Sequence, residues 1–233
     1  MGGFEAPRPP RCSSGGSPSV CCPPTAVCTG RRRTGALALR RRVGGRPARV
    51  HPLKLGLMPY LHQAARTAHT EGVPMMRAMV LEFPDDPGCA HLERQYMLGP
   101  DLLVAPVFSD EGDVTYYVPE GTWTRFADGG TVTGPRWVRE RHDFTSVPLL
   151  VRPGAVVPVG AVTDRPDYDY ADGVTLRAYG LAHGARVTVP VGDVTFTVVR
   201  EGRVLRASCG NPRAPWGLAA GAGRSGRRRA RAL

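Results

Sequence analysis

The chain has 233 residues, of which 42% are hydrophobic, so it is long enough for one large domain or two small ones with a real core. Its formal net charge of +11 belongs to the ends: residues 1–51 contain ten Arg and a single acid, and residues 208–233 contain six Arg and no acid. Residues 52–207 keep 15 of the 31 basic and 19 of the 20 acidic side chains, a charge of −4, which excludes a basic central domain. The Arg-rich ends have no interleaved aromatic residues and no recognisable nucleic-acid-binding motif, so we expect no specific nucleic-acid partner.

The first segment, residues 1–52, is rich in Arg, Pro, Gly, Ser and Cys and shows neither helical nor strand periodicity. Ordering such a segment costs about 1 to 2 kcal/mol per residue, and it has little apolar surface to bury in return. We therefore expect this segment, and the basic tail at residues 208–233, to be disordered. No apolar run near the start resembles a secretory signal, so we expect a cytoplasmic protein with no membrane partner.

Four cysteines of the first segment, Cys12, Cys21, Cys22 and Cys28, could suggest a metal site. They form no CxxC pair and have no His partner at zinc-finger spacing. Disulfides would need an oxidising compartment, which the missing export signal argues against. We expect no metal, no cofactor and no disulfide here.

Apolar residues recur at helical spacing after Leu53 and predict a helix over Leu61–Thr70, with Pro59 in its first turn and Gly72 at its end. His62 and His69 are seven residues apart and therefore share roughly one face. They could be metal ligands, but a polar flank on a half-buried helix is the favoured interpretation.

A nearly unbroken apolar run, Met75–Phe83, follows and predicts a strand buried on both faces, as in a parallel α/β sheet or barrel. An acidic turn ends it. Glu82, Asp85 and Asp86 could be catalytic carboxylates at the end of a barrel strand. The favoured interpretation is structural, because Asp side chains in an FPDDP turn accept hydrogen bonds from nearby N–H groups.

From Leu102 onward, short β-branched and aromatic runs alternate with Gly, Pro and Asp turns, which is typical of an antiparallel β-sandwich. Val187–Val191 and Val194–Val199 flank Gly192-Asp193 and predict a tight hairpin. Trp123 and Trp137 are expected in the sandwich core or as cover for a sheet edge. An exposed Trp could still stack on a sugar ring.

Several stretches together resemble one family: LMPYLHQAARTAHTEGVPMMRAMVLEFPDDP, RQYMLGPDLLVAPVF, VPEGTW, RWVRERHDF, VPLLVRPGAVVPVG and DRPDYDYADG. They are similar to the end of the catalytic barrel and the following β-domain of glycoside hydrolase family 31, especially its bacterial α-xylosidase branch. The resemblance covers Leu53 to about Ala207. It implies a mainly β fold in which residues 53–101 are the last helix–strand step of a (β/α)8 barrel and residues 102–207 are an antiparallel β-sandwich.

The resemblance implies a retaining α-glycosidase acting on α-xyloside or α-glucoside oligosaccharides, with one Asp as nucleophile and a second as acid/base. In the family both lie on earlier barrel strands, so no catalytic residue is assigned in this chain, and we expect it to be inactive alone. The alternative is a non-catalytic β-sandwich module that binds carbohydrate or supports a catalytic partner.

At the N-terminus, Gly2, Gly3 and Phe4 resemble a family loop whose Phe helps wall the sugar subsite, which implies that Phe4 binds substrate. Nothing similar follows in residues 6–51. One hypothesis is that residues 6–51 and 208–233 are translated out of the ancestral reading frame, since both are rich in Arg, Ala and Gly and contain no Lys.

Overall fold

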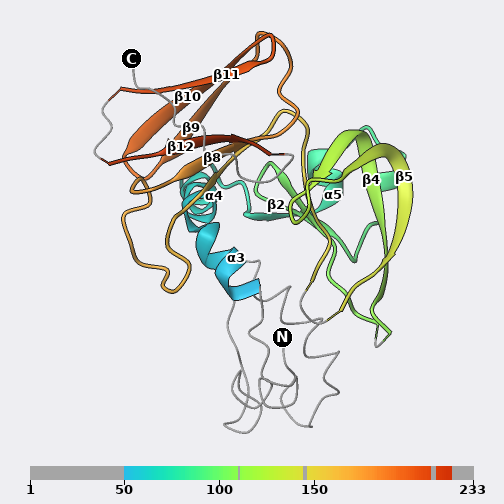
Figure 1. The fold of residues 1–233 in the computed structure, drawn as a ribbon. Helices are drawn as coiled ribbons and strands as arrows, with labels where there is room; N and C mark the ends of the chain where they lie inside the picture. Colours follow the sequence, from blue (N-terminus) through green and yellow to red (C-terminus); the bar gives the residue numbers. More distant parts are fainter. Residues whose placement is uncertain (1–49, 110, 144–145, 211–213, 222–233) are drawn as a thin grey trace, which may run out of the picture.

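The structure, a computed structural model, describes residues 50–109, 111–143, 146–210 and 214–221. This part of the chain is mainly β, with strands in largely antiparallel sheets and few helices, as the sequence predicts (Figure 1). The expected disorder of the two ends concerns residues that mostly lie outside the described part. None of the described helices is long and apolar enough to cross a membrane.

The helical elements are α3 (Val50–Gly56), α4 (Met58–Glu71), α5 (Met79–Glu82) and the 3-10 helix η1 (Pro87–Cys89). The first sheet has the order β1 (Met76–Arg77), β2 (Tyr96–Leu98), β3 (Leu102–Val104), β6 (Leu149–Val151), β4 (Asp113–Arg125) and β5 (Thr131–Arg141). The second has the order β11 (Val204–Cys209), β10 (Val194–Glu201) and β9 (Arg186–Val191). The third has the order β12 (Gly217–Ala220), β8 (Thr175–Ala178) and β7 (Val156–Val159).

Helix α4 confirms the helix predicted from apolar spacing, and it begins three residues earlier. Pro59 occupies its first turn, and Gly72 ends it with φ 73°, a left-handed conformation that glycine adopts without strain. The Gly72 N–H donates to the Ala68 carbonyl at 3.2 Å. Tyr60 and Leu61 are buried on the inner face of α4, so the helix covers one side of the first sheet.

The expectation of a long strand over Met75–Phe83 is wrong. Strand β1 has two residues, paired antiparallel with β2, and the chain then forms the single turn of α5. Met79 is buried and Phe83 packs against the same core, a helical spacing of four, whereas Val80 and Leu81 are exposed. An apolar run by itself does not distinguish a strand from a helix, and here no described strand continues the ladder beyond Arg77.

Strand β3 lies inside the first sheet, between β2 and β6, and all three of its residues are buried. Leu102 and Val104 face the core under α4, and Leu103 faces the core under the β4–β5 hairpin. This matches an unbroken apolar run covered on both faces. The β4–β5 hairpin closes the far edge of the sheet, and β5 is a strand that the sequence did not predict.

The two three-stranded sheets share one hydrophobic core. Phe196 and Val198 from β10 and Leu176 and Ala178 from β8 belong to it, so the sheets pack face to face as in a small sandwich. The predicted β9–β10 hairpin is confirmed, with Gly192 at φ 58° in its turn.

Strands also extend beyond Ala207, where we expected the sandwich to end. Strand β11 continues to Cys209, and β12 pairs parallel with β8. The tail was expected to be disordered because it is basic and rich in Gly and Ala. The backbone of Gly217–Ala220 forms hydrogen bonds with the edge of β8. Amino-acid composition does not reveal such a partner.

A cluster of charged side chains ties β1 and α5 to the turn before β7. The Glu82 carboxylate accepts from Arg77 at 2.5 Å and from Arg152 at 2.9 Å. Arg77 also donates from Nε to the Pro74 carbonyl at 2.9 Å, and its side chain is largely buried. One carboxylate therefore bridges two guanidiniums that lie 75 residues apart in the chain.

Asp101 lies beside this cluster. Burial raises the pKa of its carboxyl to about 6, although the Arg152 and Arg77 guanidiniums act in the opposite direction. The folded state therefore holds a proton that the unfolded chain releases near pH 4. The contribution of Asp101 to stability decreases as the pH rises from about 4 to 6 and is constant above that range.

We predict that Glu82→Gln lowers the free energy of unfolding by about 2 to 4 kcal/mol, because it leaves two partly buried guanidiniums without a compensating charge. Urea unfolding followed by circular dichroism measures the change. Glu201→Gln is the matched control, since the Arg206–Glu201 pair is mostly exposed and should contribute less than about 0.5 kcal/mol. Equal effects of the two substitutions would contradict a bridging role for Glu82.

We predict that Asp101→Asn raises the free energy of unfolding at pH 7 by about 1 to 3 kcal/mol, because it removes the cost of ionising a buried carboxyl. The gain should shrink as the pH falls and vanish near pH 4, where both proteins carry a neutral side chain. Melting temperatures between pH 4 and 8 test this, with exposed Asp164→Asn as control. A gain that is independent of pH would rule out the ionisation of Asp101 as its cause.

Candidate functional site

The carboxylates singled out in the sequence do not converge. Asp86 caps η1: its carboxylate accepts from the Gly88 N–H at 2.9 Å, and the Tyr117 hydroxyl lies 3.1 Å from each of its oxygens. Both oxygens of Glu82 are bound by arginines, and Asp85 is exposed. The structural interpretation of Asp86 as a turn former is therefore confirmed, and Glu82 also has structural partners.

The histidines do not form a metal site. His62 is half-buried and packs on the ring of Tyr170, with the ring centroids 5.1 Å apart, whereas His69 is exposed. Among the described residues no three His, Cys, Asp or Glu side chains gather in a way that could hold an ion. The four cysteines of the first segment, and Phe4, lie outside the described part of the chain, so their roles remain predictions.

Cys89 could be considered as a nucleophile, because it follows the acidic turn directly. It is buried, and burial together with the neighbouring Asp86 raises the pKa of its thiol to about 12. A thiolate is the nucleophilic form of cysteine, so this side chain is unreactive at neutral pH. It serves as a small apolar side chain of the core.

The two tryptophans considered in the sequence have different environments. Trp123 is fully buried, and its indole N–H donates to the Pro119 carbonyl at 3.0 Å, which confirms it as a core residue. Trp137 lies on the outermost strand β5 and is 59% exposed. It packs against the Tyr117 ring with a centroid separation of 5.5 Å. It therefore covers the sheet edge while most of its surface contacts solvent.

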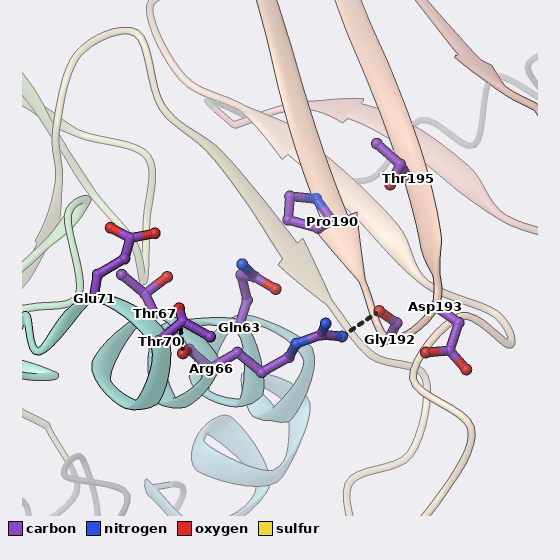
Figure 2. A pocket seen from close by; sticks show the side chains of 9 residues that line it. All are labelled: Gln63, Arg66, Thr67, Thr70, Glu71, Pro190, Gly192, Asp193 and Thr195. Atoms are coloured by element: carbon purple, nitrogen blue, oxygen red, sulfur yellow. Dashed lines mark hydrogen bonds between the residues drawn. The ribbon is translucent and has the colours of Figure 1, made fainter.

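A polar cleft of about 380 Å³ separates α4 from the β9–β10 turn (Figure 2). Its lining comes from the exposed face of the helix and from the hairpin: Gln63, Arg66, Thr67, Thr70, Glu71, Pro190, Gly192, Asp193 and Thr195. Arg66 spans it, donating from Nη1 to the Gly192 carbonyl at 3.2 Å. Figure 2 shows Glu71 and Asp193 at opposite ends, so they form no acid/base pair. The cleft can donate and accept hydrogen bonds but shows no catalytic arrangement.

This cleft was not predicted from the sequence. Two of its components could be predicted: Gly192-Asp193 was expected to form a turn, and the apolar face of the helix implies a polar face opposite to it. However, Arg66 and Gly192 are 126 residues apart, and only the tertiary structure brings the turn over the helix.

In comparisons with known proteins, two parts of the chain each match a family model. Residues 72–157 match the glycosyl hydrolase family 31 C-terminal domain, and residues 169–230 match the C-terminal domain of the α-xylosidase YicI. The second match extends almost to the end of the chain, which argues against the out-of-frame hypothesis for residues 208–230.

Curated relatives agree with these models. An α-xylosidase from Emericella nidulans is 44% identical over 135 residues, which is 54% of this chain and 17% of the relative. The α-xylosidase XylQ from Lactiplantibacillus pentosus is 39% identical over 159 residues, which is 66% of this chain and 21% of the relative. The chain thus spans about a fifth of the length of these relatives.

Among solved structures, the family 31 α-xylosidase from Xanthomonas citri has a similar fold, with a TM-score of 0.73 at 20% identity. The superposition covers 91% of this chain and 26% of that enzyme. Two adjacent family models, both from the C-terminal region, and α-xylosidase relatives of clear identity agree. The chain therefore carries C-terminal domains of glycoside hydrolase family 31, over residues 72–157 and 169–230.

Proposed function

We propose that this chain is the C-terminal portion of a retaining α-glycosidase, of α-xylosidase or α-glucosidase type, that hydrolyses O-glycosyl bonds of oligosaccharides. Residues 53–101 are then the last helix–strand step of the catalytic barrel, and the β-rich region after them supports it. The nucleophile and the acid/base of a retaining enzyme are two carboxylates about 5 Å apart. In this proposal neither is contributed by residues 53–207, so the chain does not catalyse hydrolysis alone.

The observation that carries this proposal is the surface of β1 and α5. Met76, Val80 and Leu81 are exposed, with Leu81 at 63%, while Met79 between them is buried. Three exposed large apolar side chains within six residues are unusual on the solvent-facing surface of a complete domain. They fit a helix–strand step whose remaining neighbours are other parts of a barrel.

The ion cluster supports the same view. Arg77 and Arg152 hold Glu82 on the inner side of this segment, so α5 stays against the sheet while Leu81 points outward. A segment fixed on one side and apolar on the other is suited to packing between two layers.

A second candidate function is a non-catalytic module that binds carbohydrate or supports a catalytic partner. The exposed Trp137 and the polar cleft beside α4 favour it, because sugars are bound by aromatic faces and hydrogen-bonding side chains. In this alternative the chain has the family's fold but no part in hydrolysis.

An activity assay tests the proposal. The purified chain should hydrolyse an aryl α-xyloside on the order of 10⁶ times more slowly than an intact family 31 α-xylosidase measured in parallel, because groups that act as a unit are missing. Turnover comparable to the intact enzyme would show that residues of this chain supply the chemistry.

Substitutions on α5 test the exposed surface. Leu81→Ser should change the free energy of unfolding by less than about 0.5 kcal/mol and reduce the binding of an apolar fluorescent dye, because Leu81 contacts solvent. Met79→Ala, two residues away, should cost about 2 to 5 kcal/mol because it opens a cavity in the core. If Leu81→Ser destabilised the protein as much as Met79→Ala, Leu81 would be packed against other residues of this chain. The surface of α5 would then need no further partner.

A further inference from the structure

Phe108 and Trp137 are large aromatic side chains that remain more than half exposed, at 56% and 59%. Phe108 follows β3, and Trp137 lies on β5 at the edge of the first sheet, seen at the right of Figure 1. Isolated exposed apolar residues are common on protein surfaces, but an exposed aromatic ring that lines a hollow, as Phe108 does, is typical of a binding surface.

The hollow has a volume of about 520 Å³ and lies between β4 and the segments around residues 93 and 108. Its lining combines apolar and polar side chains: Glu93, Arg94, Pro106, Phe108, Ser109, Asp113, Val114 and Thr115. Phe108 is therefore one wall of this hollow, and Thr115 of β4 is another.

Strand geometry places Trp137 on the same side as the hollow. Thr115 and Tyr117 are two residues apart on β4 and project from one face of it. Tyr117 is paired with Trp137 and contacts its ring, and Thr115 is paired with Arg139. The hollow beside Thr115 and the exposed Trp137 ring thus lie on one face of the β4–β5 hairpin, which we call the hairpin face.

The polar groups of the hairpin face are of both signs. Arg139 is paired with Asp113 at 3.2 Å on the surface, and the Asp113 N–H donates to the Ser109 hydroxyl at 2.9 Å. Glu93 and Arg94 are exposed at the rim of the hollow. A surface that carries charges of both signs does not favour a polyanion or a polycation.

A ligand for this face needs flat apolar patches that stack on the two aromatic rings. It also needs many hydroxyl groups that form hydrogen bonds with the carboxylates, guanidiniums and hydroxyls of the protein. A neutral sugar chain has both, since the C–H faces of its rings are apolar and their edges carry hydroxyls. Hydrogen bonds to charged partners are stronger than neutral ones, which favours hydroxyls held by Glu93 and Arg94.

We propose that the hairpin face is a non-catalytic binding site for neutral oligosaccharides, in which Trp137 and Phe108 stack on sugar rings and the side chains around Thr115 bind their hydroxyls. This site rests on the second candidate function, carbohydrate binding, and not on the proposed glycosidase activity. It uses none of the carboxylates considered for catalysis, so binding here can be present whether or not hydrolysis is supported.

Titration of the full chain with a xyloglucan heptasaccharide and, separately, with isomaltotriose and maltoheptaose tests the proposal by isothermal calorimetry. The wild-type protein should bind at least one of these probes with a saturable isotherm. Trp137→Ala and Phe108→Ala should each weaken binding about tenfold or more, since an exposed aromatic anchor carries much of the affinity of such sites. Val204→Ala, which removes another exposed apolar side chain, should leave binding unchanged.

Thr115→Arg provides a second variant whose side chain is exposed, so it fills the hollow without removing core contacts. It should abolish binding while the melting temperature stays close to that of the wild type. Absence of saturable binding to all three probes, or binding that survives both Trp137→Ala and Thr115→Arg, would overturn the proposal. Because the readout is binding, its failure is distinct from the absence of turnover on an aryl α-xyloside.

Discussion

The bridge from Glu82 to Arg77 and Arg152 is the interaction on which the arrangement of this chain depends. It joins a two-residue strand and a one-turn helix, neither of which could stay folded alone, to the turn between β6 and β7. Arg152 also lies over the Phe83 ring at 4.6 Å and donates to the Pro100 carbonyl at 3.0 Å. One cluster thereby fixes the junction between the helical region and the sheets.

Elements with local signals could be predicted from the sequence, whereas β1 and α5, which depend on distant partners, could not. Helix α4 was predictable because its signals are local: apolar spacing, Pro59 in the first turn and Gly72 at the end. The β9–β10 hairpin was predictable from Gly192-Asp193 for the same reason. The run after Met75 was not, because a strand needs a partner, and the only described neighbour of β1 is the short β2.

Other features needed tertiary information. Strand β5 was missed because most of its side chains are exposed and it lacks a clean apolar alternation. The fully buried Trp123 and the exposed Trp137 could not be told apart in the sequence, since burial depends on which strand ends the sheet. The cleft beside α4 and the hollow at the hairpin face arise from residues far apart in the chain. The resemblance to family 31, by contrast, could be recognised from the sequence, because it rests on several stretches of similar residues.

In the proposed function, the described region supports the catalytic part of a family 31 enzyme. Near the acidic turn Asp86 caps a helix and Glu82 bridges two arginines, and the buried Cys89 thiol is unreactive. What it exposes is an apolar surface on α5 and aromatic side chains on the hairpin face. We propose these as surfaces for contact with protein and with sugar, and neither role requires a catalytic pair.

Glu82 and Asp86 have structural roles, and we propose that no carboxylate of this chain is a glycosidase nucleophile. A retaining glycosidase forms a covalent glycosyl-enzyme intermediate. A fluorinated glycosyl fluoride traps it, because the ring fluorine slows its hydrolysis while the fluoride leaving group keeps its formation faster. Incubation of the chain with an activated fluorinated α-xylosyl donor, followed by mass spectrometry of the intact protein, tests this directly. We predict no mass increase, under conditions that label an intact family 31 α-xylosidase. A stoichiometric one-sugar adduct on an Asp or Glu of this chain would contradict the account.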